Sequence, residues 1–159
     1  MKNNDFTILC VDDNKTNLEV LSTILLEQEY KLALAKSGKS ALEIIDKEAI
    51  DLILLDIMMP GELDGYKLCK ILKEKKETKE IPIVFVTARS EVKDLVKGLQ
   101  LGANDYITKP FQAEEILARV KTHLKLSHLQ QQLKDRVNYL EKSRFELMNW
   151  LHDLAKTIE

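Results

Sequence analysis

Cysteine, proline, glycine and tryptophan are all scarce in this chain. Its 159 residues include two cysteines, three prolines, five glycines and one tryptophan. The two cysteines, Cys10 and Cys69, form no C-x-x-C pair and stand among apolar residues. We therefore expect two buried free thiols in a reducing cytosol rather than a disulfide framework.

The chain also lacks a long apolar run and a strong net charge. No segment approaches the length of a membrane-spanning helix, and the N-terminus lacks the apolar core of a signal peptide. These absences predict a cytoplasmic protein that does not contact a membrane. The formal net charge of -2 indicates no bulk attraction to nucleic acid or anionic lipid. The length suits one compact domain plus an appendage.

Short apolar runs alternate with helical patterns along the first two thirds of the chain. The runs do not alternate with polar residues, which is typical of strands buried on both faces. Strands are expected over 6–11, 32–35, 52–55, 81–86 and 106–107, and helices over 14–29, 38–48, 64–75 and 91–101. Asn14 is suited to cap the first helix, and Gly102 to end the fourth. This order predicts an α/β fold with a parallel sheet covered by helices on both faces.

A single long helix is expected from Gln112 onward, because no glycine or proline follows Pro110. Leucines recur every seventh residue, at Leu126, Leu133, Leu140, Leu147 and Leu154. The second seam is imperfect, with Leu129, Arg136, Ser143, Trp150 and Thr157, and is partly repaired by Val137, Leu151 and Ile158. We predict a coiled coil that makes the protein a homodimer. The alternatives are a helix folded back onto the domain or one packed against a partner.

The same tail does not resemble a DNA-binding arm. From Gln112 to the end it carries eight basic and seven acidic residues, so its charges nearly balance. A nucleic-acid-binding segment would show a basic stripe instead. We therefore expect no nucleic acid to be contacted by this chain.

Polar residues follow the predicted strands at their carboxyl ends. Asp12 and Asp13 follow the first strand, Asp56 the third, Thr87 the fourth and Lys109 the fifth. Ligands bind at this edge of an open parallel sheet, where the strand order reverses. A single aspartate after a strand is usually a turn or cap residue. Five such groups in this order are an improbable accident, and they predict one site.

The composition of this site indicates phosphoryl chemistry. Three neighbouring carboxylates need a cation, and oxygen ligands without His or Cys favour Mg²⁺. With the cation bound, one carboxylate can act as a nucleophile toward phosphorus and form an aspartyl phosphate. Lys109 and Thr87 are suited to neutralise and hold the transferred phosphoryl oxygens.

Four segments resemble the receiver domain of bacterial two-component response regulators, of the chemotaxis-receiver type. They are residues 8–13, 54–60, 84–88 and 102–111, and the resemblance covers about residues 5–125. It implies a flavodoxin-like receiver fold, a doubly wound five-stranded parallel sheet with strand order 2-1-3-4-5. Residues 126–159 are then expected to be a coiled-coil extension. It leads to an output domain absent from this chain, or acts itself through protein contact.

The resemblance also implies a role for each site residue. Asp56 corresponds to the phosphoacceptor, which takes its phosphoryl group from the phosphohistidine of a sensor histidine kinase or phosphotransfer protein. Asp13, and Asp12 partly through water, correspond to ligands of Mg²⁺. Asp56 and the backbone carbonyl of Met58 complete that set. The chain would be a phosphoacceptor that catalyses only its own phosphorylation and dephosphorylation, not an enzyme acting on another substrate.

A conformational switch is implied as well. Thr87 corresponds to the hydroxyl that moves toward the phosphoryl group, and Lys109 to the lysine that pairs with it. Tyr106 corresponds to an aromatic switch whose ring turns inward as Thr87 moves, although an ordinary surface tyrosine is the alternative. The bond between Lys109 and Pro110 is expected to be cis, a conformation that proline makes accessible. The signal is expected to reach the C-terminal helix and the dimer interface.

One departure from the family pattern lies beside the site. Three residues, Gly61-Glu62-Leu63, separate Pro60 from the Asp-Gly pair that opens the next helix, where the family usually has two. The positions two residues after Asp56 and after Thr87 hold Met58 and Arg89. Because bulky or charged groups there would obstruct a hydrolytic water, we expect a long-lived aspartyl phosphate.

Three other interpretations compete with a signalling receiver. A phosphatase of the haloacid-dehalogenase type would need a second aspartate two residues after the nucleophile, where this chain has Met58. A receiver used only as a dimerisation scaffold would not need its five site residues. His152-Asp153-Leu154 faintly resembles the phosphoacceptor helix of histidine kinases but lacks the downstream proline, so a truncated signalling helix is favoured.

Overall fold

The structure is a computed structural model that describes residues 1–88 and 92–158. The chain divides into two compact units, Met1–Leu124 and Lys125–Glu159. The first is an α/β unit and the second is helical. No helix in the described ranges is long and apolar enough to span a membrane.

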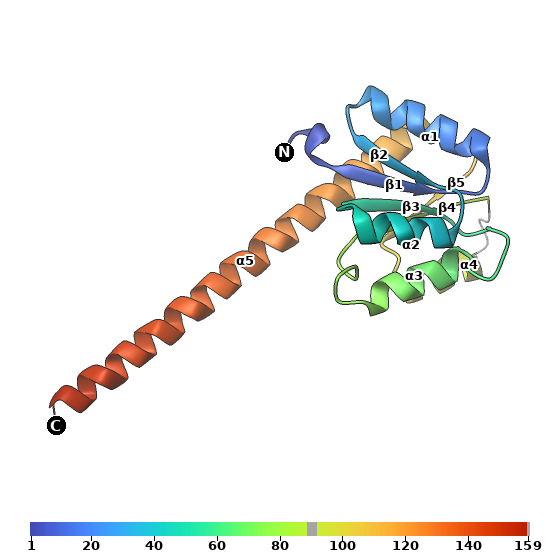
Figure 1. Ribbon diagram of the computed structural model, residues 1–159. Coiled ribbons are helices and arrows are strands. Elements are labelled where there is room, and N and C mark those ends of the chain that lie inside the picture. The colour runs from blue at the N-terminus through green and yellow to red at the C-terminus, as the bar shows by residue number, and fades with distance from the viewer. Residues whose placement is uncertain (89–91, 159) are drawn as a thin grey trace. The chain divides into compact units, whose positions relative to one another are not determined.

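The α/β unit is built on a five-stranded sheet in which every neighbouring pair of strands is parallel. The strands are β1 (Thr7–Val11), β2 (Lys31–Ala35), β3 (Leu52–Asp56), β4 (Ile83–Thr87) and β5 (Asp105–Thr108). Their order across the sheet is β2-β1-β3-β4-β5 (Figure 1). This confirms the predicted α/β fold and its strand order.

Among the described residues, four α-helices connect successive strands, and a fifth follows the last strand. They are α1 (Lys15–Glu27), α2 (Gly38–Lys47), α3 (Gly65–Glu74), α4 (Val92–Gln100) and α5 (Ala113–Ile158). A short 3-10 helix, η1 (Asn3–Asp5), precedes β1 and was not predicted. The side chain of Asn14 accepts a hydrogen bond from the backbone N–H of Asn17 and caps α1, as the sequence predicts. The predicted start of α4 at Glu91 lies outside the described residues.

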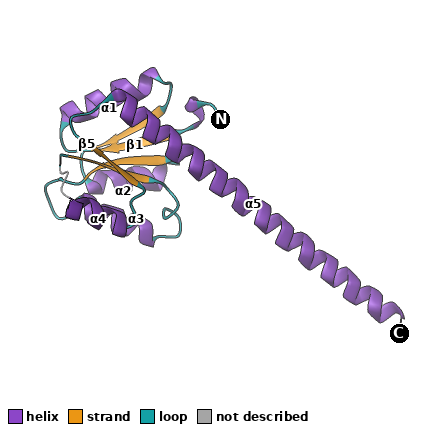
Figure 2. Ribbon diagram, turned by 180° about the vertical axis from the view of Figure 1, so that it is seen from behind, coloured by secondary structure: helices purple, strands orange, loops and turns teal. Residues whose placement is uncertain are grey.

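Alternation along the strands creates two separate apolar cores. Leu9 and Leu55 belong to the cluster that includes residues of α2 and α3. Cys10 and Leu54 belong to the cluster that includes residues of α1 and the first turns of α5. Figure 2 shows the strands between α1 on one side and α2, α3 and α4 on the other. Both faces of the central strands are therefore buried, which explains their continuous apolar sequence.

The helical unit consists of the part of α5 from Lys125 onward. The long last helix that the sequence predicts is thus present. Its heptad leucines are exposed, with fractions from 43% at Leu154 to 65% at Leu133. An exposed apolar row of this length is typical of a surface that pairs with another helix.

Candidate functional site

The register of the sheet brings the predicted site residues to one edge. Val11 pairs with Leu55 across β1 and β3, so Asp12 and Asp56, the next residues along, are neighbours. Thr87 and Thr108 pair across β4 and β5, which places Lys109 one residue beyond. Because β1 and β3 lie at the point where the strand order reverses, this edge is where such a sheet offers a ligand site.

Three carboxylates converge at this edge. Asp12, Asp13 and Asp56 each offer an oxygen atom, and these atoms lie within 4.8 Å of one another. Asp12 and Asp56 are buried, with exposed fractions of 1% and 4%, whereas Asp13 is exposed. An all-oxygen group that is partly open to solvent fits a hard divalent cation such as Mg²⁺.

Lys109 supplies the positive charge that faces these carboxylates. Its ammonium nitrogen Nζ lies 3.1 Å from Oδ2 of Asp12 and 3.6 Å from Oδ1 of Asp56. The lysine side chain is 21% exposed, so its charge acts in a partly desolvated environment. The Lys109–Pro110 peptide bond is cis.

Local hydrogen bonds hold the two buried carboxylates in place. Asp12 accepts one bond from the backbone N–H of Asn14 at 2.9 Å and another from the side-chain amide of Asn17 at 3.1 Å. Asp56 accepts a bond of 3.3 Å from the backbone N–H of Met58. Asn17 was not predicted as a site residue, because no sequence pattern shows which polar residue of α1 faces Asp12.

The two predicted switch residues occupy different environments. Thr87 is fully buried at the end of β4, and its carbonyl oxygen accepts a hydrogen bond from the backbone N–H of Lys109 at 2.8 Å. Tyr106 is half-buried on β5 and packs against the core cluster that contains Phe85. Thr87 and Lys109 are therefore directly coupled, while Tyr106 lies beside Phe85 in the sheet register.

The rim of the site is only partly described. The side chain of Met58 is 52% exposed, so it lies at the surface beside Asp56. Gly61, in the longer loop, has φ +99°, a conformation that favours glycine. Arg89, the other predicted rim residue, lies outside the described residues.

The environment of Asp56 makes its carboxyl unusually easy to protonate. Burial, and next the charge of Asp12, raise the pKa of Asp56 from 3.8 to about 6. Lys109 and the N–H of Met58 act in the opposite direction but do not cancel the effect. Ionisation of Asp56 therefore lowers the stability of the folded protein. Strongly shifted pKa values of this kind are typical of functional sites.

Asp56→Asn is expected to stabilise the protein near neutral pH when divalent cations are chelated. The folded pKa of about 6 exceeds the unfolded value of 3.8, so the fold loses stability as pH rises through this window. Asparagine removes that loss. Urea unfolding should show a gain of about 1–3 kcal/mol at about pH 7.5, shrinking toward about pH 4. Asp46→Asn, at an exposed position, is the control. A pH-independent gain would contradict this explanation.

Known proteins with this arrangement are signalling receivers. Residues 8–121 match the family described as the response regulator receiver domain. A two-component response regulator from Clostridium difficile is similar in structure, with a TM-score of 0.70, 32% identity, and coverage of 76% of this chain and 96% of that one. A CheY-like receiver domain protein from Methanospirillum hungatei gives a TM-score of 0.73, 26% identity, and coverage of 79% and 98%.

A curated protein of Vibrio cholerae serotype O1 is similar in sequence over a longer stretch. It is named "Probable cyclic di-GMP phosphodiesterase" and is 42% identical over 135 residues, which are 85% of this chain and 30% of that protein. This chain therefore spans about three tenths of the length of that relative. With the fold, the strand-end carboxylates and the match over 8–121 taken together, the chain belongs to the response regulator receiver domain family, whose members are phosphoacceptors in two-component signalling.

Proposed function

We propose that Asp56 is the phosphoacceptor of this receiver and takes its phosphoryl group from the phosphohistidine of a sensor histidine kinase or phosphotransfer protein. The observation that carries this proposal is the position of the Asp56 carboxylate. It lies at the end of a central strand, within 4.8 Å of the other two aspartates and 3.6 Å from the Lys109 ammonium. A buried carboxylate with these neighbours is suited to attack phosphorus.

Asp12, Asp13 and Asp56, together with the backbone carbonyl of Met58, would hold a Mg²⁺ ion. All of these donors are oxygen atoms, which is the ligand type that Mg²⁺ prefers. The bound ion would supply positive charge that offsets repulsion between the carboxylates and the incoming phosphoryl group. Lys109 alone cannot neutralise three carboxylates, which is a further reason to expect a cation.

The transfer itself needs few groups of this chain. One carboxylate oxygen of Asp56 forms a bond to phosphorus while the bond from phosphorus to the histidine nitrogen breaks, and the histidine keeps that electron pair. Lys109 would pair with a phosphoryl oxygen, and the Thr87 hydroxyl would donate a hydrogen bond to another. Catalysis would therefore rest on positioning and charge neutralisation, as is general for phosphoryl transfer.

The new dianion at Asp56 would also act as a switch. Thr87 and Lys109 would turn toward it, and the Tyr106 ring would take the space that Thr87 leaves. Because Thr87 ends β4 and Tyr106 lies on β5, the surface formed by α4, β5 and α5 would change. We propose that this change is transmitted through α5 to a homodimer interface made by residues 126–159.

The Vibrio relative supports a role for the helix as a connection to an output domain. Its similarity covers 135 residues, and the α/β unit contains 124, so at least 11 of the aligned residues lie in the helical unit. Sequence similarity that continues past the α/β unit favours the same role for this helix in both proteins. We propose that this chain is the receiver of a longer regulator whose output is a cyclic di-GMP phosphodiesterase or a similar effector.

Incubation with acetyl phosphate tests the phosphoacceptor proposal. We expect the intact mass to rise by one phosphoryl group when Mg²⁺ is present, and labelling to slow by at least about 100-fold when EDTA replaces it, because the charge repulsion is then uncompensated. Labelling at equal rates without Mg²⁺ would exclude the proposed metal role. No labelling under either condition would favour an idle scaffold, and turnover of generic phosphate esters would favour a phosphatase.

A further inference from the structure

Helix α4 lies against an aromatic pair from two neighbouring elements. A Cβ atom added at Gly98 of α4 would be 2.7 Å from the Phe85 ring of β4, so the helix and this ring are in close contact. The ring of Tyr66, from α3, meets the ring of Phe85 edge-on, with centroids 5.7 Å apart and an angle of 73°. This geometry is favourable for aromatic pairs and fixes the Tyr66 ring next to α4.

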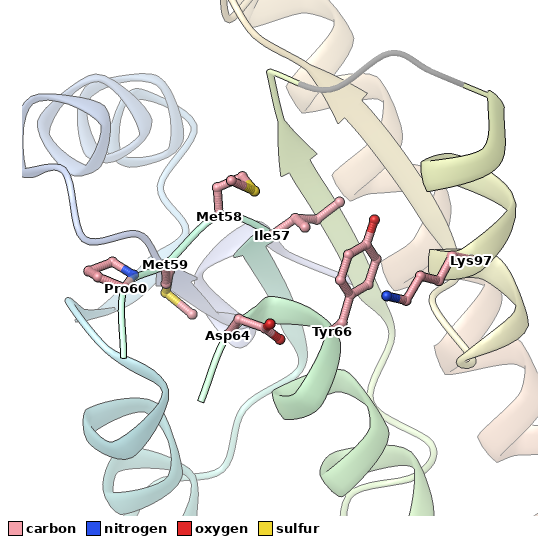
Figure 3. Close-up of a pocket in the computed structure, with 7 residues that line it drawn as sticks. All are labelled: Ile57, Met58, Met59, Pro60, Asp64, Tyr66 and Lys97. Atoms are coloured by element: carbon pink, nitrogen blue, oxygen red, sulfur yellow. The ribbon is translucent and has the colours of Figure 1, made fainter. Parts of the chain in front are cut away.

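Tyr66 makes two polar contacts with α4 itself. Its hydroxyl donates a hydrogen bond of 3.2 Å to the backbone carbonyl of Asp94. The ammonium of Lys97 lies 4.4 Å from the centre of its ring, within the range of a cation–π interaction. Figure 3 shows the Lys97 ammonium directed at the Tyr66 ring, across from Ile57 and Met58. One tyrosine thus contacts α4 at two successive turns.

The other end of this contact is fixed to the phosphoacceptor strand. Gly65, the residue before Tyr66, donates a backbone hydrogen bond of 3.1 Å to the carbonyl of Ile57. A Cβ atom at Gly65 would collide with the backbone carbonyl of Asp56, so α3 begins directly against the end of β3. The position of Tyr66 is therefore set by the backbone of Asp56 and Ile57.

A pocket of about 420 Å³ lies between these parts. It is lined by Ile57, Met58, Met59, Pro60, Asp64, Tyr66 and Lys97. The pocket is lined on one side by the loop after Asp56 and on the other by Lys97 of α4. The Tyr66 side chain lines this pocket and reaches across to Asp94 and Lys97 of α4.

We infer that Tyr66 is a positioning residue that holds α4 against the loop after Asp56 in the unphosphorylated protein. This inference rests on the proposed function, in which phosphorylation of Asp56 changes the surface that includes α4. The contacts between Tyr66 and α4 oppose that change. Their strength therefore affects how much phosphodonor is needed to phosphorylate Asp56. Breaking one of the contacts between Tyr66 and α4 favours the phosphorylated conformation without altering any group that contacts the phosphoryl oxygens.

Tyr66→Phe tests the inference because it removes the hydroxyl and keeps the ring that packs against Phe85 and faces Lys97. In the absence of any phosphodonor, amide hydrogen exchange in residues 92–100 is expected to accelerate roughly fivefold, the equilibrium effect of one ordinary hydrogen bond. The acetyl phosphate concentration that half-saturates labelling is expected to fall by a similar factor, while the maximal rate stays unchanged. Tyr139→Phe, the same change at an exposed position of α5, is the matched control.

Lys97→Met provides a second variant, because it keeps an apolar stem over the Tyr66 ring and loses the cation. It is expected to accelerate amide exchange in α4 and to lower the half-saturating acetyl phosphate concentration, as Tyr66→Phe does. Unchanged exchange and half-saturation in both variants, with wild type labelled normally, would overturn the inference alone. Failure of wild type to label would overturn the proposed function. Amide hydrogen exchange of α4 would still measure the effect of the contacts between Tyr66 and α4.

Discussion

Asp56→Asn will reduce phosphoryl labelling by acetyl phosphate by at least about 100-fold, because an amide is a far weaker nucleophile than a carboxylate. The substitution is nearly isosteric, and the backbone N–H of Met58 still finds an acceptor in the amide oxygen. The fold should therefore persist, and the loss should reflect chemistry alone. Intact-mass spectrometry of wild type and variant at several times of incubation with Mg²⁺ provides the measurement.

The position of the label sharpens this test. An acyl phosphate at Asp56 is hydrolysed by alkali, whereas a phosphoramidate on histidine is stable to alkali and maps to another peptide. Asp46→Asn, at an exposed position in α2, should label like wild type. Undiminished labelling of the asparagine variant, or a label on His152, would mean that Asp56 is not the acceptor.

Leu140→Lys is expected to raise the dimer dissociation constant by at least about 100-fold. Leu140 occupies the middle of the leucine row and is 54% exposed on the single helix. In a two-stranded coiled coil it would face its counterpart in the partner, so two ammonium groups would be buried together without counter-ions. Sedimentation equilibrium of the full chain measures the change directly.

Phe145→Lys makes the same kind of change away from the row. Phe145 lies five residues after Leu140 and is 67% exposed, so its side chain would point outward from the coil. We expect this variant to dimerise like wild type. Equal dissociation by both variants, or a monomeric wild type, would contradict the coiled coil. Identical sedimentation and solution scattering with and without beryllofluoride would contradict a dimer that responds to phosphorylation.

The sheet was predictable because each of its strands has a recognisable local pattern in the sequence. Each strand is a short apolar run, and in a parallel fold the residue after each run has to emerge at the same edge. The sequence therefore indicated that Asp12, Asp56 and Lys109 would meet, and the structure places the Lys109 ammonium 3.1 Å from Asp12 and 3.6 Å from Asp56. Their roles, the metal and the phosphate lifetime remain predictions.

Contacts made by helix faces were not predictable in this way. Asn17 reaches Asp12, and Tyr66 reaches Asp94, only because of how α1 and α3 are rotated against the sheet. Periodicity identifies the apolar face of a helix but not which polar residue at its edge meets a partner.

The charge network between β5 and α5 is a similar case. Asp105 accepts hydrogen bonds from Arg119 at 2.7 and 2.9 Å and lies 2.9 Å from Nε2 of His123. Burial opposes ionisation of Asp105, but these partners hold its pKa below the usual value. Arg119 and His123 lie 14 and 18 positions after Asp105 in sequence, so only the packed fold brings them to it.

The uninterrupted course of α5 from Ala113 to Ile158 affects how such a chain is joined to another domain. Each residue of an α-helix turns the chain by about 100°, so adding one residue rotates whatever follows by more than a quarter turn. Adding seven residues restores nearly the same azimuth and shifts the attachment by roughly 10 Å. The rotational phase of an attached module is thus determined by residue count, with steps of seven preserving the direction in which the module faces.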